Sequence, residues 1–283
     1  MSVKVVVDSG GDIPSDLIAK HQIEIVPLKI RFGDTEYVDT KELTTDQFWE
    51  LCKTSKELPQ TAAPSSGDFE ASFRQAKSDG FDEIVCITLS SDLSATFQAA
   101  TLAARTFEDE LKIEVIDSRL ATFAMGNLAI ASSVEAAQGS NAEQIAAMVR
   151  NRIPSMHAFG ALDTLENLRK GGRIGKAAAF FGSLLSFKPI IDVRDGVVEA
   201  DSKQRTRGKA LSYLIEKTVS FGEITDLAII HANAPDVEDF AKQLKTATGI
   251  QQLTVAKIGA VIGTHAGPRT MGITFRTLGK DTR

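Results

Sequence analysis

The stretch EIVCITLSSDLSATFQAATLAARTF at residues 83–107 decides the fold. Its opening segment, Glu83–Leu89, is apolar and rich in β-branched residues, which predicts a buried strand. The polar run Ser90–Ser94 predicts a loop, and the alanine-rich segment Ala95–Phe107 predicts a helix. A strand, a polar loop and a helix in this order are typical of a βαβ unit in a parallel sheet.

The same order recurs on both sides of this stretch. Before it, the strand-like run Val3–Val7 is followed by Asp-Ser-Gly-Gly-Asp and by a helix that we expect to begin at Pro14. After it, the strand-like run Lys112–Ile116 ends in Asp117-Ser118 and leads into an alanine-rich helix. These units predict an α/β fold whose N-terminal domain, residues 1–154, is Rossmann-like and built on a parallel sheet.

Shorter elements fill the rest of the N-terminal domain. We expect a small hairpin insertion at about residues 25–40, because the extended stretch Ile23–Phe32 is followed by a turn and a short return strand. Thr44 and Gln47 have the spacing of a capping box, which predicts the start of a helix. The polar stretch from Thr54 to Ser66 predicts an irregular loop.

The second half of the chain mixes hairpins with helices. Two short strand-like runs flank Arg194-Asp195-Gly196, which is a hairpin signal. Lys176–Leu185 is strongly apolar and predicts a helix, whereas the glycine-rich segment Gly263–Pro268 predicts a tight loop. This pattern predicts a smaller C-terminal α+β domain at residues 155–283.

The composition is that of an ordinary globular protein. The 283 residues are 43% hydrophobic and 24% charged, and the formal net charge is −5. These proportions exclude a disordered, collagen-like or disulfide-scaffold protein, and the length favours two domains. The mild acidity argues against general nucleic-acid binding, which needs a strongly basic face. No apolar run approaches the roughly 18–20 residues that cross a bilayer, and the first residues resemble a buried strand instead of a signal peptide.

Two isolated cysteines and several missing motifs limit the chemistry. Cys52 and Cys86 have no spacing for zinc, and we expect reduced thiols in a cytoplasmic protein. No G-x-G-x-x-G supports a dinucleotide cofactor, and Lys170 occupies the position of the first glycine that a P-loop ending at Gly175-Lys176 would need. The motifs H-E-x-x-H and G-x-S-x-G are also missing from the sequence. We therefore expect neither a cofactor nor a metal.

Small polar residues follow three of the predicted strands, at Asp8-Ser9, Ser90–Ser94 and Asp117-Ser118. In an open parallel sheet, ligands bind at the carboxyl ends of the strands, where helix N-termini favour anions. Thr61 and Ser65 lie in an irregular loop that can fold over the same edge. The pattern predicts a small anion held by hydroxyls and backbone amides. The alternative is that these residues are only helix caps and Asx-turns.

His265 and two basic clusters are further candidates. The imidazole of His265 would orient a ligand or donate a hydrogen bond near neutral pH, or else bond only to the backbone of a turn. The basic clusters predict a docking patch for an acidic or phosphate-bearing partner, although such runs are commonly solvated faces. They consist of Arg169, Lys170, Arg173 and Lys176, and of Lys203, Arg205, Arg207 and Lys209.

These segments together resemble the DegV family of bacterial fatty-acid-binding proteins over essentially the whole chain. Each segment alone is a weak signal, but so many matching segments in the family's order are specific for the family. The matching segments are VVVDSGGDIP at 5–14, IVPL at 25–28, YVD at 37–39, TAAPS at 61–65 with Gly67 and Phe69, SSDLSATFQAA at 90–100, IDS at 116–118, LRKGGRI at 168–174, KPI at 188–190, Lys203–Lys209 and Gly263–Pro268.

The resemblance implies a DegV-type two-domain fold and a bound long-chain fatty acid. It implies that Thr61 and Ser94 contact the carboxylate, with His265 beside them and with Ser91 and Ala95 in the same binding motif. The family delivers the acid to a separate dihydroxyacetone-kinase-like fatty acid kinase, which phosphorylates the carboxylate with ATP for phospholipid synthesis. The chain would then be a carrier subunit without catalysis of its own.

The resemblance also implies contacts with partners, and the sequence departs from the family at two places. The kinase would dock near Arg205, with Lys203 and Arg173, and a transient contact with membranes is compatible with this role; no nucleic acid is implied. Ala62-Ala63 replaces the family's Ser-Gln, and Ala95 replaces a glycine. The second change matters only if that backbone needs a positive φ.

Elementary energetics agree with a fatty-acid ligand. Each buried methylene gains about 0.8 kcal/mol, so a long acyl chain supplies roughly ten kcal/mol gross. A carboxylate in a dry cleft must recover its lost hydration through hydrogen bonds. Residues 60–66 and 90–96 contain no lysine or arginine, so neutral donors would leave a carboxylate oxygen able to attack ATP. The apolar segment Ala177–Leu185 offers surface for the tail, unless it is an ordinary core helix.

Two other functions stay open at this point. A serine hydrolase would use Ser94 as nucleophile, His265 as base and Asp117 to orient the base. This chain order is permissible, although the nucleophile elbow is missing. A phosphate or nucleotide sensor would instead need a polar pocket and would carry no lipid.

Overall fold

The computed structural model describes residues 2–180 and 187–278. The N-terminal part is built on a four-stranded parallel sheet with the strand order β2-β1-β6-β7. Its strands are β1 (Val3–Asp8), β2 (Glu24–Val26), β6 (Glu83–Thr88) and β7 (Lys112–Asp117). The parallel sheet expected from the alternation of strands and helices is confirmed.

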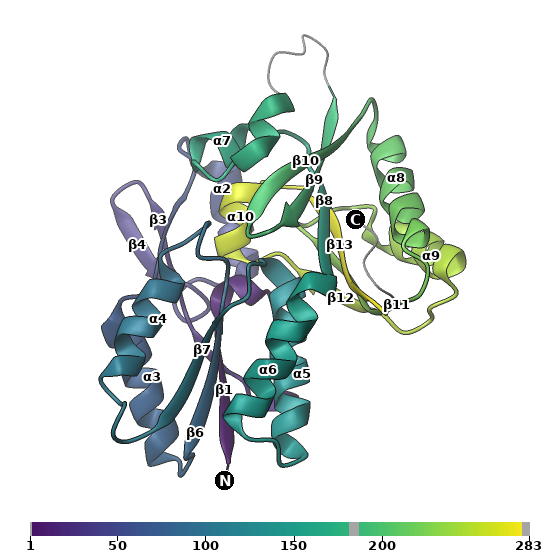
Figure 1. Cartoon of the computed structure of the whole chain (residues 1–283). Helices are drawn as coiled ribbons and strands as arrows, with labels where there is room; N and C mark the ends of the chain where they lie inside the picture. Colours follow the sequence, from purple (N-terminus) through teal and green to yellow (C-terminus); the bar gives the residue numbers. More distant parts are fainter. Residues whose placement is uncertain (1, 181–186, 279–283) are drawn as a thin grey trace.

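Helices cover both faces of this sheet, as Figure 1 shows. They are α3 (Ser66–Ser78) and α4 (Thr96–Arg105) on one face, and α5 (Thr122–Ala137) and α6 (Ala142–Arg152) on the other. Because successive side chains of a strand point to opposite faces, β1 contributes to two cores. Val6 packs in the cluster with Phe73 of α3, whereas Val5 and Val7 belong to the cluster with Leu128 of α5. The arrangement is Rossmann-like.

A second, small sheet has the order β4-β3-β5. Its strands are β3 (Lys29–Phe32), β4 (Thr35–Val38) and β5 (Gln60–Ala62). The hairpin expected at about residues 25–40 is therefore formed by β3 and β4, while Ile25 lies in the large parallel sheet. The polar stretch Thr54–Ser66 is not wholly irregular, because β5 lies within it and pairs with β3.

Two further helices are α1 (Ser15–His21), which packs against α5, and α2 (Thr45–Thr54), which shares a core with β3. Helix α1 begins at Ser15, one residue after the predicted start at Pro14, which is its N-cap. The capping box expected at Thr44 and Gln47 is confirmed, because each side chain bonds to the backbone of the other.

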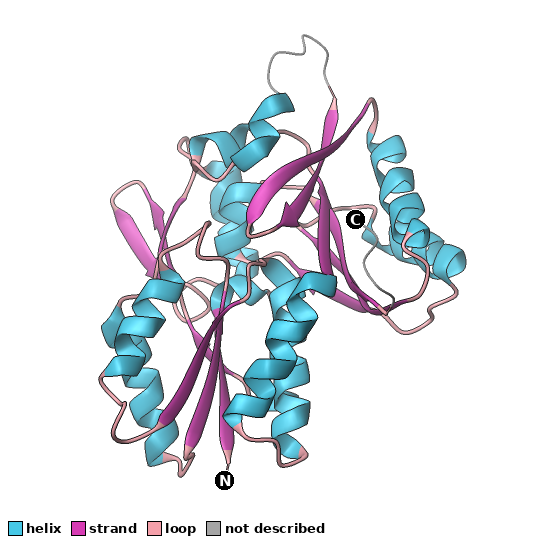
Figure 2. Cartoon of the chain, viewed as in Figure 1, coloured by secondary structure: helices cyan, strands magenta, loops and turns pink. Residues whose placement is uncertain are grey.

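The C-terminal part carries a six-stranded mixed sheet with the order β10-β9-β8-β13-β11-β12. Only β11 and β12 pair in parallel among these neighbours. The helices α8 (Arg207–Ser220) and α9 (Val237–Thr248) cover one face. The strands are β8 (Met156–Ala161), β9 (Lys188–Arg194), β10 (Val197–Gln204), β11 (Ile224–His231), β12 (Thr254–Lys257) and β13 (Met271–Thr277). Figure 2 shows the two large sheets as separate layers in the two halves of the molecule.

One hydrophobic core crosses between the halves. Leu28, Phe48 and Trp49 come from the N-terminal part, and they pack against Ile230 and Ile258 on the face of the mixed sheet opposite α8 and α9. The indole Nε1 of Trp49 donates a hydrogen bond to the Ile258 carbonyl at 3.0 Å. The domain boundary at residues 154/155 stays a prediction, because this core contains residues from both sides of it.

The glycine-rich segment at residues 263–268 was expected to be a loop, and this expectation was wrong. It forms most of a short helix, α10 (Ala260–Ala266), which lies between the two halves (Figure 1). The helix tolerates Gly263 because packing requires it: a Cβ there would come within 2.7 Å of Trp49. Close approach of the helix to the aromatic core therefore overrides the low helix propensity of glycine.

Two other short elements complete the fold. Helix α7 (Glu166–Lys170) follows β8, and a 3-10 helix occupies Gly175–Phe180. The predicted helix at Lys176–Leu185 is thus replaced by a 3-10 helix up to Phe180, and its remainder lies outside the described residues. Within the described part of the chain, no helix is both long enough and apolar enough to span a membrane.

Candidate functional site

The hydroxyl of Thr61 and the imidazole of His265 meet although 204 residues separate them. Thr61 lies on β5, where it pairs with Ile30 of β3, and His265 lies in the last turn of α10. The distance between Thr61 Oγ1 and His265 Nε2 is 3.0 Å. This is the pair that the family resemblance places at a carboxylate.

His265 is neutral at physiological pH. Burial, and secondarily the charge of Arg173, lowers the pKa of His265 to about 4. Its Nδ1 is buried and has no hydrogen-bond partner among the residues that the structure describes. Gly171 lies directly against this atom, because a Cβ on Gly171 would be only 2.3 Å from Nδ1. If Nε2 carries the proton and donates to Thr61, the hydroxyl hydrogen of Thr61 is free for an anion.

Arg173 connects this pair with the loop that carries Ser94. Its Nε donates to the carbonyl of Leu93 at 3.1 Å, and its Nη1 donates to the carbonyl of Gly171 at 2.7 Å. A chain of contacts through His265, Gly171 and Arg173 therefore links Thr61 to Leu93, the residue before Ser94. Arg173 is half-buried, and its predicted role in docking a kinase stays a prediction.

Ser94 and Ala95 form the start of α4. The hydroxyl of Ser94 lies 2.8 Å from that of Thr96, so either group can donate to the other. Ala95 is the N-cap residue and has a φ of −75°. Since φ is negative, the backbone does not require the glycine of the family pattern at this position.

A cavity of about 630 Å³ reaches the Thr61–His265 pair. Among the described residues, Ser94 does not line it, whereas Lys56, Glu166 and Arg173 do. Behind Leu93, an apolar cluster fills the space between α7, the 3-10 helix and the β9–β10 hairpin. Its members include Leu162, Leu165, Leu168, Ala177, Ile191 and Val198. The head of the predicted site is therefore open and polar, and the apolar region next to it is packed.

Ser91 and Asp117 form a separate contact. The Ser91 hydroxyl donates to Asp117 Oδ2 at 2.5 Å, and the backbone N–H groups of Ser91 and Arg119 donate to Oδ1. Asp117 thus organises two loops, as the Asx-turn alternative expects. The Ser94, His265 and Asp117 groups of the hydrolase alternative are bonded to other partners, namely Thr96, Thr61 and Ser91.

Three buried aspartates, Asp8, Asp12 and Asp39, line a second cavity of about 540 Å³. The sequence did not predict this cavity. Desolvation by burial raises the pKa of Asp8 and of Asp12 to about 7 and that of Asp39 to about 6. Asp8 was expected as a strand-end residue and caps the following 3-10 helix at Ser9–Gly11. Asp12 and Asp39 stood only within matched motifs, and neither periodicity nor spacing marked them as buried. No group of metal-ligating residues is found in the described ranges.

These aspartates predict a stability that falls as pH rises. Between the ordinary value of 3.8 and about 7, the folded protein holds protons that the unfolded chain has released. The contribution to the free energy of unfolding is therefore complete below pH 3.8 and is lost as pH rises through about 7. Between about pH 6 and about pH 8, wild type should lose about 1 kcal/mol more than Asp12→Asn. Urea unfolding at the two pH values measures this, and equal losses would contradict the proton uptake.

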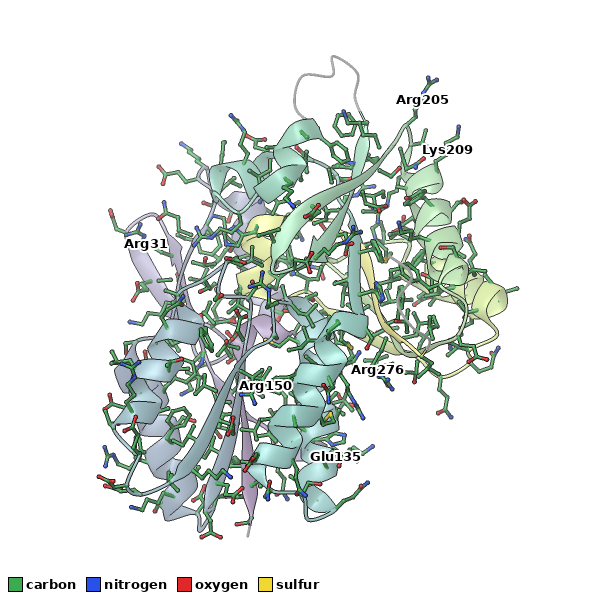
Figure 3. All side chains as sticks on the ribbon, viewed as in Figure 1. Arg31, Glu135, Arg150, Arg205, Lys209 and Arg276 are labelled. Carbon is green, nitrogen blue, oxygen red and sulfur yellow. The ribbon has the colours of Figure 1, made fainter. Side chains whose placement is uncertain are left out.

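Two of the three predicted docking residues, Lys203 and Arg205, are exposed on the C-terminal half. Figure 3 shows Arg205 and Lys209 extending away from the ribbon near the start of α8. The ammonium of Lys203 lies 4.9 Å from the ring centres of both Phe180 and Phe187. Other members of the basic clusters are already paired, as in the ion pairs Lys176–Glu199, Arg207–Asp236 and Lys170–Glu166. A docking role for Lys203 and Arg205 stays a prediction.

Comparison with known proteins gives one consistent result. The model of the family described as "Uncharacterised protein, DegV family" matches residues 2–278. A DegV domain-containing protein of Clostridium perfringens is 33% identical, and the match covers 97% of this chain and 99% of the relative. The structure of DegV from Bacillus subtilis, described as a fatty acid binding protein, has a TM-score of 0.86 at 32% identity. The match covers 98% of this chain and 99% of that one. The structure of a stearic-acid-binding protein from Eubacterium ventriosum has a TM-score of 0.88 at 26% identity. The match covers 97% of this chain and 98% of that one.

Proposed function

Because the chain belongs to the DegV family, we propose that it binds a long-chain fatty acid and presents the carboxylate to a separate ATP-dependent kinase. The kinase would form an acyl-phosphate for phospholipid synthesis in the cytoplasm. The observation that carries the proposal is the Thr61–His265 pair at the polar cavity, with a neutral imidazole behind a hydroxyl donor. In this role the chain is a carrier without catalysis of its own.

The chemistry of the head site supports a carboxylate that stays reactive. The hydroxyls of Thr61 and Ser94 are neutral donors, and the ring of His265 is neutral as well. The nearby charge of Arg173 is directed at two backbone carbonyls through Nε and Nη1. A carboxylate bound by neutral donors keeps more electron density for attack on a phosphoryl group than one in a bidentate arginine pair.

The apolar cluster behind Leu93 supports a site for the acyl tail. Its buried side chains come from residues 162–168, the 3-10 helix and the β9–β10 hairpin of the C-terminal half, and Leu93 of the N-terminal loop packs against them. A tail that entered beside Leu93 would therefore lie between the two halves. Because the cluster is packed, the tail would have to separate Leu93 from Ile191 and Val198. The methylene contacts would replace the lost side-chain contacts, at about 0.8 kcal/mol for each buried methylene.

The basic residues near the start of α8 would give the kinase a docking surface. Lys203 and Arg205 would contact acidic groups of the kinase, since both are exposed. Arg173 is half-buried beside the head site, and we propose it as the third docking residue.

Mass spectrometry of gently purified protein tests the proposal. We expect roughly one long-chain fatty acid per chain, and acyl-phosphate formation only when ATP and a dihydroxyacetone-kinase-like kinase are both added. A preparation that takes up no fatty acid, even after incubation with oleate, would refute the proposal. Labelling of Ser94 by a fluorophosphonate would support the hydrolase instead, and a bound nucleotide without lipid would support a sensor.

A further inference from the structure

One buried carboxylate joins three segments that are far apart in the sequence. Asp12 Oδ2 accepts a hydrogen bond from the Thr122 hydroxyl at 2.7 Å, and Asp12 Oδ1 accepts one from the Gly259 backbone N–H at 2.8 Å. Asp12 follows the 3-10 helix after β1, Thr122 begins α5, and Gly259 is the N-cap of α10. The two oxygens of one side chain therefore link the start of α10 to the start of α5.

Linking these segments through a buried acid costs free energy of folding. Asp12 is only 9% exposed, and burying a carboxylate is unfavourable, as its raised pKa reflects. The backbones of Asp12 and Thr122 also adopt left-handed φ values of 45° and 55°, which residues with a Cβ rarely take. A buried acid that bonds to a second residue with a left-handed backbone indicates a geometric requirement beyond simple capping.

The helix that Asp12 holds is too short to keep its place alone. Helix α10 has seven residues, and isolated helices of that length are unstable in water. The structure fixes it at three points: Asp12 at the start, the aromatic core against Gly263, and the Asn167 side chain, which donates to the Thr264 carbonyl at 3.0 Å. His265 follows directly, about 9 Å along the helix axis from Gly259.

We propose that Asp12 is a positioning residue for the fatty-acid headgroup. By holding the Gly259 N–H, it fixes the start of α10 and thereby the place of the His265 ring behind the Thr61 hydroxyl. This inference rests on the proposed function, in which the Thr61–His265 pair receives the carboxylate. Asp12 itself touches neither member of the pair.

Three variants separate positioning from general stability. Asp12→Ala removes both bonds, whereas Asp12→Asn keeps an oxygen for Gly259 and offers an N–H to the Thr122 oxygen. Glu83→Ala is the matched control, because Glu83 is also buried and its carboxylate accepts from the Ala142 N–H at the start of α6. Helix α6 lies on the parallel sheet, away from α10 (Figure 1).

The first measurement is the titration of His265 by NMR in protein without fatty acid. In Asp12→Ala we expect the pKa of His265 to move from about 4 toward its ordinary 6.5, because a loosened α10 admits water to the ring. Asp12→Asn should stay close to wild type. Glu83→Ala should lower the urea midpoint without moving the His265 titration.

The second measurement is the affinity for a fluorescent long-chain fatty acid. We expect Asp12→Ala to bind about tenfold more weakly, as for the loss of one well-placed hydrogen bond, and Asp12→Asn to recover most of the loss. If Asp12→Ala only lowers stability, as Glu83→Ala does, Asp12 is structural and the inference is wrong. If wild type binds no fatty acid, the proposed function fails, while the His265 titration still decides whether Asp12 positions α10.

Discussion

Replacing Thr61 and Ser94 together by alanine should lower the affinity for a long-chain fatty acid by at least about a hundredfold. Each hydroxyl would lose a hydrogen bond to a charged group, which is worth about 1.5–3 kcal/mol, and two such losses correspond to a factor of more than about one hundred. The acyl tail would keep its apolar contacts, so residual binding should persist. Displacement of a fluorescent fatty acid measures the affinity, and acyl-phosphate formation with kinase and ATP measures presentation.

A matched pair of hydroxyl deletions separates the head site from a general effect of losing hydroxyls. Thr101→Ala with Ser220→Ala removes one threonine and one serine hydroxyl that bond only to carbonyls of their own helices, Phe97 and Lys217. This variant should bind and be phosphorylated as wild type. Normal affinity in the Thr61/Ser94 variant, together with normal acyl-phosphate formation, would refute the head site.

Gly171→Ala tests the same site from the opposite side of the imidazole. The backbone φ of Gly171 is −74°, which alanine adopts without strain. Its new Cβ, however, would lie 2.3 Å from His265 Nδ1, so the ring must move away from Thr61. We expect a loss of affinity here too. Gly208→Ala is the control and should bind as wild type, because its added Cβ would have no described atom of another segment within 4 Å. Full affinity in Gly171→Ala would show that the place of His265 does not matter for binding.

The parallel sheet could be predicted because its signals are local. Glu83–Leu89 is a continuous apolar run, and the observed β6 and α4 lie within the predicted strand and helix. The buried faces of β6 and its neighbour β1 need only apolar side chains at successive positions, which the sequence displays directly. Periodicity therefore identifies this half of the fold.

The C-terminal half and the site depend on long-range contacts, which periodicity does not report. Helix α10 contains a glycine and is stabilised by Trp49, Asp12 and Asn167, all distant in the sequence. Strand β5 has three residues and exists because β3 pairs with it. The meeting of Thr61 with His265 follows from these two elements, so only the family resemblance suggested it in advance.

Trp49→Ala should have the largest effect on stability, about 3–5 kcal/mol in the free energy of unfolding. Trp49 is 3% exposed, its ring lies 4.8 Å from that of Phe48, and its Nε1 bonds to the Ile258 carbonyl. Alanine would leave a cavity beside Gly263 and an unpaired carbonyl next to α10. Trp49 is the only tryptophan of the chain, so circular dichroism during urea unfolding should replace fluorescence as the measurement.

Trp49→Phe distinguishes packing from the hydrogen bond. Phenylalanine keeps an aromatic ring beside Phe48 but loses the pyrrole ring together with its N–H. We expect about 1–3 kcal/mol from the unpaired Ile258 carbonyl, in addition to the cost of the smaller ring. The core that contains Trp49 joins α2 to the mixed sheet, so loss of the Trp49 ring should weaken the coupling between the halves.

Trp49→Ala should therefore unfold in two transitions where wild type unfolds in one. A single transition displaced by less than about 1 kcal/mol would mean that the two halves do not depend on this shared core.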